Sequence, residues 1–444
     1  MTRRDASSHR ARNFAYSWGS FANSISQQAF TNRVQFFYLE VVGLSAATVG
    51  WIWALFGLWN AVNDPLMGNV SDRTRWRRGR RIPYLRWFAL PLGASFLLIF
   101  TPPDGAPLLA AAWFLVSVFV FDTLLTLLTL ATNALFPEIA SSVEERSSIA
   151  AMREGLTVLA LLLAFVLAPI LSEQVGWWQM GLVIGLITAV GYIVSTLGVH
   201  EVPLDPNTPR PHIGDGFRDA FALPSFRWYL WANLAKEYVF VILAATLPLW
   251  RRYALGIDGE VDTFLGTLGP GEAEAVILGV TFVLAVPFLW MWKRITPRIG
   301  VARAWLYASV VMLPGLVMLA LSDDFMSGAL AAWLVAPGLA GYMMSPIVAL
   351  SEVIDIDAVA GKERREGLFF GINGAVGKLA FTLQGVLLGV LLSATDYDSA
   401  IDVQPEAAVD AIRFLMGWSP AIATVLAIWF LYGLDRSLRV AKDV

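Results

Sequence analysis

The residues best suited to chemistry in this sequence are ionisable side chains set in apolar segments. Asp64 lies in a long apolar segment, four residues after Asn60, so the two side chains share one face of a helix. Pro65 follows and has no N–H, which leaves the carbonyl of Ala61 without its usual helical partner. A carboxylate, an amide oxygen and a freed carbonyl are ligands for a hard cation. The pattern predicts a cation site; the alternative is that Asp64 only stabilises a helix kink.

Lys378 is a second charged residue inside an apolar segment. An ionisable group in a membrane span costs several kcal/mol unless it is paired or hydrated, so such a group is a functional candidate by default. If the Lys378 ammonium lies near Asp64, it would stabilise the empty carboxylate and be displaced when the coupling ion binds. The alternative for Lys378 is an ion pair that only joins two helices.

The segment 14–41 is unusually polar for its length. Asn23 and Gln27 are one helical turn apart, with Ser24 between them, so a hydrated helix face is expected there. Glu40 and Asp122 also lie in apolar segments, and for these two we favour pairing between helices over a place in a cavity. Lys236 and Glu237 are adjacent and so face different directions, and either a place in the cavity or pairing with other helices fits them.

The composition indicates a membrane protein. Of the 444 residues, 57% are hydrophobic and 15% are charged, whereas an ordinary soluble domain has about 25% charged residues. The mean hydropathy of +0.61 excludes a disordered chain, a nucleic-acid-binding protein and an ordinary cytosolic enzyme. Cys is absent, which excludes disulfides and thiolate metal sites, and the three His are isolated, which argues against a His-based metal cluster. We expect no enzymatic activity, no cofactor and no nucleic-acid partner.

Twelve apolar segments are long enough to cross a bilayer, which takes about 20 residues. Their apolar runs are continuous, so they predict helices rather than the alternating strands of a β-barrel. We therefore expect an all-α membrane protein with twelve transmembrane helices. The segments are 14–41, 44–71, 84–102, 107–136, 149–172, 175–199, 226–254, 272–292, 302–322, 327–352, 367–394 and 411–434.

The charges between these segments predict the orientation. Arg and Lys gather in the loops of one side and Asp and Glu in those of the other, with Arg251 and Arg252 as exceptions. Both termini are therefore expected in the cytoplasm. A Pro-rich connection divides the chain into an N-terminal six-helix bundle (1–200), a cytoplasmic linker (201–225) and a C-terminal six-helix bundle (226–444). Paired six-helix halves suggest a transporter that rocks about a central site.

The most specific motif lies between the second and third segments. Residues 63–83 read NDPLMGNVSDRTRWRRGRRIP. Gly68 allows close packing of helices, and Asp72 can pair with Arg73 or with a helix N-terminus. The Arg run holds the turn in the cytoplasm. A basic loop without a further role is the alternative.

This motif resembles the loop between helices 2 and 3 of the major facilitator superfamily, and more narrowly that of its glycoside-pentoside-hexuronide:cation symporters. Similarity extends over nearly the whole chain, including Pro137-Glu138, the acidic and basic stretch 352–367 and the segment 371–385. The resemblance implies the major facilitator fold, cation-coupled uptake of glycosides or sugars, and a central cavity that opens alternately to each side.

The resemblance also assigns roles to residues. Asp64 stands at the family's cation-binding Asp, whereas Asn60 replaces a second Asp of sodium-using relatives. A lone carboxylate in an apolar span favours its neutral form, which suits proton coupling. Asn60 can also lend an oxygen to sodium, so the coupling ion is expected to be a proton or sodium. The expected cation-coupling residues are Asp64, Asn60, Lys378 and Thr126; the substrate-binding residues are Asn23, Ser24, Gln27, Thr129 and Arg153; the conformational motif contains Gly68, Asp72, Arg73, Gly79, Arg80 and Arg81.

Ser24 and Thr129 stand where relatives carry sugar-binding carboxylates, which makes galactosides a poor expectation. The leading hypothesis is a secondary active symporter of a glycoside, sugar or related polar solute. One alternative moves an amphiphile such as a lysolipid, and another is a receptor or scaffold that transports nothing. We expect a monomer in the cell membrane (the inner membrane of a Gram-negative cell), with a small-molecule solute and the lipid bilayer as partners.

Overall fold

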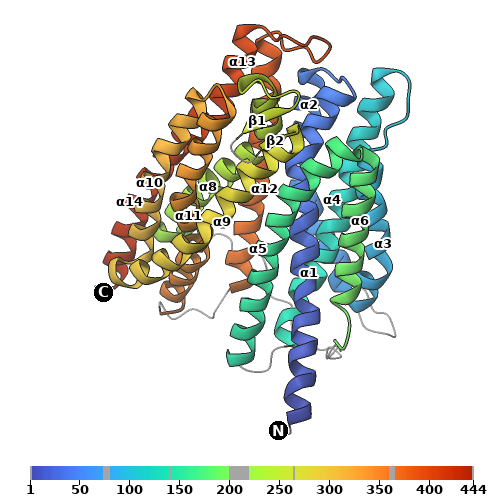
Figure 1. The fold of residues 1–444 in the computed structure, drawn as a ribbon. Coiled ribbons are helices and arrows are strands. Elements are labelled where there is room, and N and C mark those ends of the chain that lie inside the picture. The colour runs from blue at the N-terminus through green and yellow to red at the C-terminus, as the bar shows by residue number, and fades with distance from the viewer. Residues whose placement is uncertain are drawn as a thin grey trace. The chain divides into compact units, whose positions relative to one another are not determined.

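The computed structural model describes residues 3–73, 81–139, 143–199, 220–263, 266–359 and 366–442. Nearly all of them are helical (Figure 1), which confirms the expected all-α membrane fold. The exception among the described residues is a pair of short antiparallel strands, β1 (Val261–Thr263) and β2 (Gly266–Leu268). The chain divides into two compact units, Met1–Thr208 and Pro209–Val444.

The first unit is a bundle of long helices. Helix α1 packs against α5 and α6, α3 packs against α4 and α6, and α2 packs against α4. Helices α3 and α6 approach closely where Gly93 faces Gly185, because a Cβ on either residue would meet the backbone carbonyl of the other. The elements are α1 (Arg3–Phe36), η1 (Phe37–Val41), α2 (Ala46–Arg73), α3 (Ile82–Ile99), α4 (Pro107–Ile139), α5 (Val143–Gln174) and α6 (Trp177–Val194).

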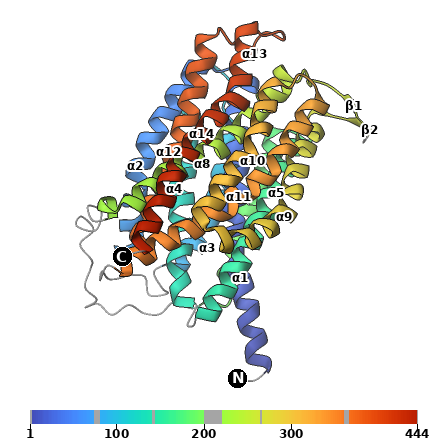
Figure 2. The ribbon, with the colours of Figure 1, turned by 90° about the vertical axis from the view of Figure 1, so that its left-hand side faces the viewer.

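The second unit is also a helical bundle (Figure 2), in which α10 packs on α11, α11 on α9, and α8 on α12 and α14. Small residues on α10 and α11 surround the buried Trp292 of α9. The elements are α8 (Pro224–Leu249), η2 (Trp250–Ala254), α9 (Pro270–Ile299), α10 (Val301–Leu321), α11 (Phe325–Val359), α12 (Glu366–Ala394), α13 (Glu406–Arg413), η3 (Phe414–Trp418) and α14 (Ser419–Lys442).

The first long helix of each unit ends in a π-helix of five residues. Helix α1 continues into η1, and α8 continues into η2. π-Helical turns are rare and occur often at functional sites. The two units therefore share this feature at the end of their first long helix.

Ten helices within the described residues are long and apolar enough to cross a membrane. Helices α1 and α2 are not among these ten, so the structure supports the membrane fold without confirming the count of twelve. Helix α1 has 34 residues, which corresponds to ~50 Å at about 1.5 Å per residue. Its polar composition, rather than its length, separates it from the apolar spans.

The two Arg residues that break the charge pattern both have carboxylate neighbours. Arg251 on η2 is buried, its Nε lies 3.7 Å from Oε2 of the buried Glu274, and its Nη1 donates to the carbonyl of Ile257. Arg252 Nε lies 3.1 Å from Oδ1 of Asp258. Each positive charge is therefore balanced by a nearby carboxylate. Neither Arg changes the net charge of the loops on the acidic side of the chain.

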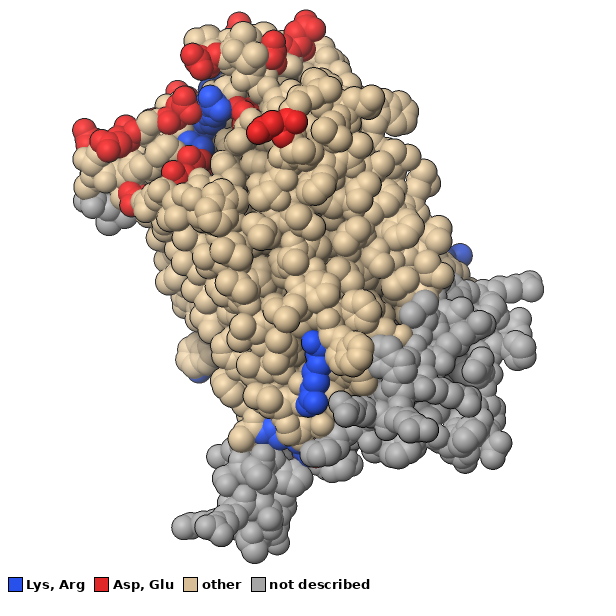
Figure 3. Space-filling view, turned by 90° about the vertical axis from the view of Figure 1, so that its right-hand side faces the viewer, with Lys and Arg blue, Asp and Glu red and all other residues tan. Residues whose placement is uncertain are grey.

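Acidic side chains gather at one end of the face drawn in Figure 3. In the second unit, exposed acidic residues occur in the connections between helices, including Asp258, Glu260 and Asp398. Asp324 precedes α11 and accepts the backbone N–H of Ser327 at 2.7 Å. This bond lowers the pKa of the Asp324 carboxyl and caps the N-terminus of the helix.

Candidate functional site

Helix α2 carries three neighbouring polar side chains, of which Asn63 contacts α4. Asn60 and Asn63 are buried and Asp64 is half-buried. Residues three and four positions apart in a helix are neighbours on its surface, so the three side chains form one stripe. The stripe contains Asp64 and Asn60, two of the residues expected to couple the cation.

The contact between α2 and α4 is a buried hydrogen-bond network. Asn63 Nδ2 donates to Oδ2 of Asp122 at 2.7 Å and lies 3.4 Å from Oγ1 of Thr126. Thr126 was expected at the cation site, and the structure places it beside this stripe. Sequence reasoning did not single out Asn63, although its position three residues after Asn60 was a usable signal.

Lys378, the fourth residue expected in cation coupling, lies on α12 in the second unit and is partly buried. Three glycines of the same helix, Gly371, Gly374 and Gly377, would meet nothing within 4 Å if each gained a Cβ. Lys378 therefore follows a stretch of α12 whose surface is open. Its pairing with Asp64, which belongs to the other unit, stays a prediction.

Two residues expected to bind the substrate contact each other between α1 and α4. The hydroxyl of Thr129 donates to Oδ1 of Asn23 at 2.7 Å and lies 3.3 Å from the hydroxyl of Tyr192 on α6. Asn23 and Thr129 are half-buried, whereas Tyr192 is fully buried. The contact fixes two polar groups at the edge of the unit's interior.

Arg153 on α5 is held by polar and aromatic groups from two other helices. Its Nε donates to Oγ of Ser20 and its Nη2 to Oδ1 of Asn133, both at 2.7 Å. The guanidinium carbon lies 5.8 Å from the ring centre of Tyr16 and 5.5 Å from that of Phe136. An oriented guanidinium of this kind can bind hydroxyl or carboxylate oxygens with defined geometry.

Ser24 and Gln27 share the half-buried face of α1 with Asn23. Within the described part of the chain, neither side chain takes part in the hydrogen bonds of Thr129 or Arg153. The structure therefore joins Asn23 to Thr129, fixes Arg153 separately and leaves Ser24 and Gln27 on the same helix face.

The conformational motif is described only in part. Arg81 at the start of α3 is buried, and its Nη1 donates to the carbonyl of Ala134 on α4. Gly79 and Arg80 lie outside the described residues. The backbone of Gly68, Asp72 and Arg73 belongs to α2, but their side chains lie outside the described part.

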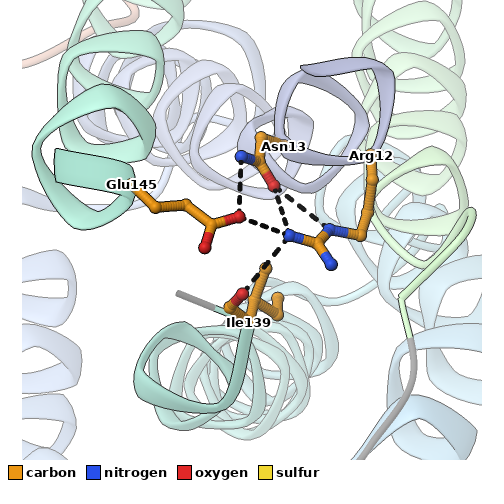
Figure 4. A network of polar contacts seen from close by, with 4 residues as sticks. All are labelled: Arg12, Asn13, Ile139 and Glu145. Carbon is orange, nitrogen blue, oxygen red and sulfur yellow. Dashed lines mark hydrogen bonds and ion pairs between the residues drawn. The ribbon is translucent and has the colours of Figure 1, made fainter. Parts of the chain in front are cut away.

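A second network, which the sequence did not reveal, joins α1, α4 and α5 (Figure 4). Arg12 Nη2 lies 2.6 Å from Oε1 of Glu145 and 3.3 Å from the carbonyl of Ile139, and Asn13 Nδ2 donates to the same Glu145 oxygen at 3.3 Å. The Arg12 guanidinium thus lies at the C-terminus of α4, and the Glu145 carboxylate lies near the N-terminus of α5. Each charge complements the dipole of that helix. The network holds in place the three helices that carry Asn23, Thr129 and Arg153.

The second unit has its own polar groups on α8. Asn373 Oδ1 on α12 accepts hydrogen bonds from the hydroxyl of Tyr229 at 3.0 Å and from Nδ2 of Asn233 at 2.9 Å. For Lys236 and Glu237 the sequence left open a place in the cavity or pairing with other helices; in the structure Lys236 Nζ lies 2.9 Å from Oε1 of Glu237 itself. Their flexible stems allow this contact although the two residues point about 100° apart on the helix.

Comparison with known sequences identifies one family over nearly the whole chain. The family described as MFS/sugar transport protein matches residues 15–435. Among curated proteins, the isoprimeverose transporter of Lactiplantibacillus pentosus is 24% identical, over 95% of this chain and 88% of its own. The putative glycoside/cation symporter YagG of Escherichia coli is 23% identical, over 92% and 88%.

The name of a more distant relative gives a different class of solute. The sodium-dependent lysophosphatidylcholine symporter 1-A of Danio rerio is 22% identical, over 91% of this chain and 82% of its own. Among solved structures, a bacterial homologue of the human lysosomal transporter Spinster has a TM-score of 0.70 at 14% identity, covering 98% of both chains. A D-xylose-proton symporter has a TM-score of 0.67 at 12% identity, covering 95% of this chain and 97% of its own. These structural likenesses concern the fold.

Proposed function

Because the chain belongs to the MFS/sugar transport protein family, we propose that it is a secondary active transporter that couples the uptake of a glycoside, sugar or related polar solute to a cation. This family membership agrees with the resemblance of residues 63–83 to the glycoside-pentoside-hexuronide:cation symporters of the major facilitator superfamily. One relative is named an isoprimeverose transporter and another a putative glycoside/cation symporter, and these names support this solute class.

The observation that carries the proposal is the oriented polar set on α1, α4 and α5. Asn23 and Thr129 meet at 2.7 Å, and Arg153 is held by two bonds of 2.7 Å and two aromatic rings. These half-buried groups offer amide, hydroxyl and guanidinium donors to a solute rich in hydroxyl groups. Carboxylates are absent from this set, which agrees with a solute other than a galactoside.

The cation would act on the neighbouring stripe of α2. Asp64 supplies charge, and Asn60 and Thr126 supply neutral oxygens, which are the ligands that hard cations prefer. A bound cation neutralises the carboxylate and so lowers the cost of moving the unit through its conformational cycle. We assign Lys378 the opposite task of stabilising the carboxylate between ions, and the basic motif that includes Gly68, Asp72 and Arg81 the task of changing conformation.

A lysolipid or another amphiphile is the second candidate solute. It is favoured by the name of the Danio rerio relative and by the replacement of two expected carboxylates by Ser24 and Thr129. The polar face of α1 opposes it. We place the protein in the cell membrane as a monomer, with both termini in the cytoplasm.

Flux measurements in proteoliposomes test the proposal. Labelled glycosides, pentoses and lysophosphatidylcholine are offered separately under an imposed sodium gradient, an imposed proton gradient, or neither. We expect a glycoside or sugar to accumulate only when a cation gradient is present. Accumulation of lysophosphatidylcholine alone would replace the solute class, and the absence of any gradient-dependent flux would overturn the proposal.

A further inference from the structure

Lys236 and Glu237 form an ion pair in the middle of a membrane-spanning segment, and the proposed transport cycle gives this pair no task. Both residues lie near the centre of the span Pro224–Ala254. Lys236 Nζ lies 2.9 Å from Oε1 of Glu237, and the exposed fractions of the two side chains are 15% and 27%. Within the described part of the chain, neither residue forms an ion pair with a third side chain. Ionisable residues at this depth are costly and mark functional sites by default.

The pair lies on the side of α8 that is turned away from lipid. Trp231 is 54% exposed and marks the lipid-facing side of this helix. Because successive residues are about 100° apart around a helix axis, Lys236 lies roughly 140° from Trp231 in one direction and Glu237 roughly 120° from it in the other. The exposed atoms of the pair are therefore directed away from the side that contacts the bilayer.

Two further polar residues share this side of α8. The hydroxyl of Tyr229 and Nδ2 of Asn233 both donate to Oδ1 of Asn373 on α12, at 3.0 and 2.9 Å. Oδ1 of Asn233 is itself buried and accepts no hydrogen bond from any of the described residues. Glu237 lies one helical turn after Asn233, so the two side chains are neighbours on the helix surface. An acceptor that needs a donor thus lies beside the charged pair.

The surface of α12 around Asn373 is open. A Cβ on Gly371, Gly374 or Gly377 would meet nothing within 4 Å. These glycines lie before and after Asn373 in the chain, so open space lies beside the point where α12 bonds to α8. The polar side of α8 is therefore next to room that a ligand can occupy.

The groups around this space match the hydroxyl groups of a sugar. A carboxylate accepts two O–H bonds side by side, so Glu237 can bind two neighbouring hydroxyls of one ring. Lys236 has three N–H donors, of which the bond to Glu237 uses one. Phe240 follows one turn after Lys236, and Nζ lies 5.9 Å from the centre of its half-buried ring. Sites for small molecules combine such an aromatic surface with a few placed polar groups.

We propose that Glu237 and Lys236, together with Asn233, form a solute-binding subsite of the second unit that takes two neighbouring hydroxyl groups of the solute. Phe240 gives the apolar face of the same sugar ring a surface to pack on. The inference rests on the proposed transport of a glycoside or sugar, and it names the part of the solute that this unit recognises. The polar set on α1, α4 and α5 contains no carboxylate, so Glu237 supplies the charged acceptor that the set lacks.

Because the chain has no native Cys, the exposure of the subsite can be tested without a solute. Glu237→Cys in nanodiscs is treated with the water-soluble, charged reagent 2-sulfonatoethyl methanethiosulfonate, and mass spectrometry measures the labelled fraction over time. The control is Val425→Cys, because Val425 is 54% exposed at a similar depth in the last span. Glu237→Cys should react at least about tenfold faster, since a charged reagent does not reach a thiol that faces lipid. Equal rates at the two positions would overturn the proposal.

Binding of defined sugars tests the contact itself. The melting temperature of the purified full-length protein is measured with increasing isoprimeverose or D-xylose. We expect a saturable rise for the wild type with at least one of the two sugars. Glu237→Gln should raise the half-saturating concentration at least about tenfold, because an amide offers one acceptor oxygen and no charge. Glu260→Gln changes an exposed connecting residue of the same unit and should bind as the wild type does.

A double variant separates binding from stability, since Glu237→Gln alone leaves Lys236 without its carboxylate. Lys236→Met with Glu237→Gln removes both charges and should melt near the wild-type temperature, yet it should bind the sugar at least about tenfold more weakly. Wild-type affinity in the double variant would show that the pair only stabilises α8, and this would overturn the subsite while the proposed function stands. A wild type that neither sugar stabilises would refute the proposed solute class and the subsite with it.

Discussion

The hydroxyl of Thr129 on α4 donates a hydrogen bond to the side-chain oxygen of Asn23 on α1 at 2.7 Å. The two residues are 106 positions apart in the chain. Their side chains are half-buried, and we propose that the remaining polar atoms of the pair, the Asn23 amide nitrogen and the Thr129 lone pairs, bind the solute.

Thr129→Val removes this bond while keeping the size of the side chain. We expect the affinity for the solute to fall about three- to tenfold, since a neutral hydrogen bond contributes about 0.5–1.5 kcal/mol. Counterflow at several solute concentrations measures the change. Thr132→Val serves as the control, because the hydroxyl of Thr132 donates only to the carbonyl of Leu128 in its own helix. Equal affinity in both variants would remove Thr129 from the binding site.

Arg153→Lys keeps the positive charge but cannot make both bonds of the guanidinium to Ser20 and Asn133. We expect solute affinity to fall at least about tenfold, because a lysine offers a point charge without the fixed fork of arginine. Arg86→Lys, which alters a guanidinium bonded to Thr196 in the turn after α6, should leave affinity near the wild-type value. A normal affinity in Arg153→Lys would show that Arg153 only joins helices.

Asp64→Asn tests the coupling of solute and ion. We expect accumulation against a gradient to be abolished, whereas solute exchange survives because the polar groups on α1, α4 and α5 remain. Proteoliposome flux with sodium and proton gradients imposed separately measures both activities. Asp104→Asn changes an exposed loop residue of the same unit and should transport normally. Undiminished accumulation in Asp64→Asn would contradict its assignment.

The orientation can be measured in a chain that has no native Cys. Arg298 is exposed near the end of α9 and Asp323 is exposed after α10. The 21 residues of α10 span ~31 Å at about 1.5 Å per residue, so the two positions should face opposite sides of the membrane. Asp323→Cys should react with an impermeant maleimide in intact cells and Arg298→Cys only after permeabilisation. The reverse pattern would invert the proposed topology.

The buried pair of Arg251 and Glu274 should contribute to stability asymmetrically. Glu274→Gln leaves the buried Arg251 charge without its carboxylate, and we expect a loss of about 3–5 kcal/mol. The double variant Arg251→Met with Glu274→Leu should recover most of that loss, since two apolar side chains carry no buried charge. Thermal unfolding in detergent compares the two, with Arg252→Met at the partly exposed neighbouring pair as the control. A double variant less stable than Glu274→Gln would contradict this account.

The sequence by itself determined the class of the protein and its family. Long continuous apolar runs can only become helices in a bilayer, because every backbone polar group must be satisfied within its own segment. The motif at 63–83 and the charge pattern are local properties of the chain, so they could be interpreted without a structure. Helical spacing also placed Asn60 and Asp64 on one face correctly.

Only the tertiary structure decided which residues from different helices meet. The pairing of Asn63 with Asp122, of Asn23 with Thr129 and of Arg12 with Glu145 joins positions 59, 106 and 133 residues apart. Each pair depends on which faces of two helices pack together, and this packing is set by side-chain shape over the whole bundle rather than by local periodicity. For that reason the sequence could favour an interhelical partner for Asp122, but only the packing of α2 on α4 identifies that partner as Asn63.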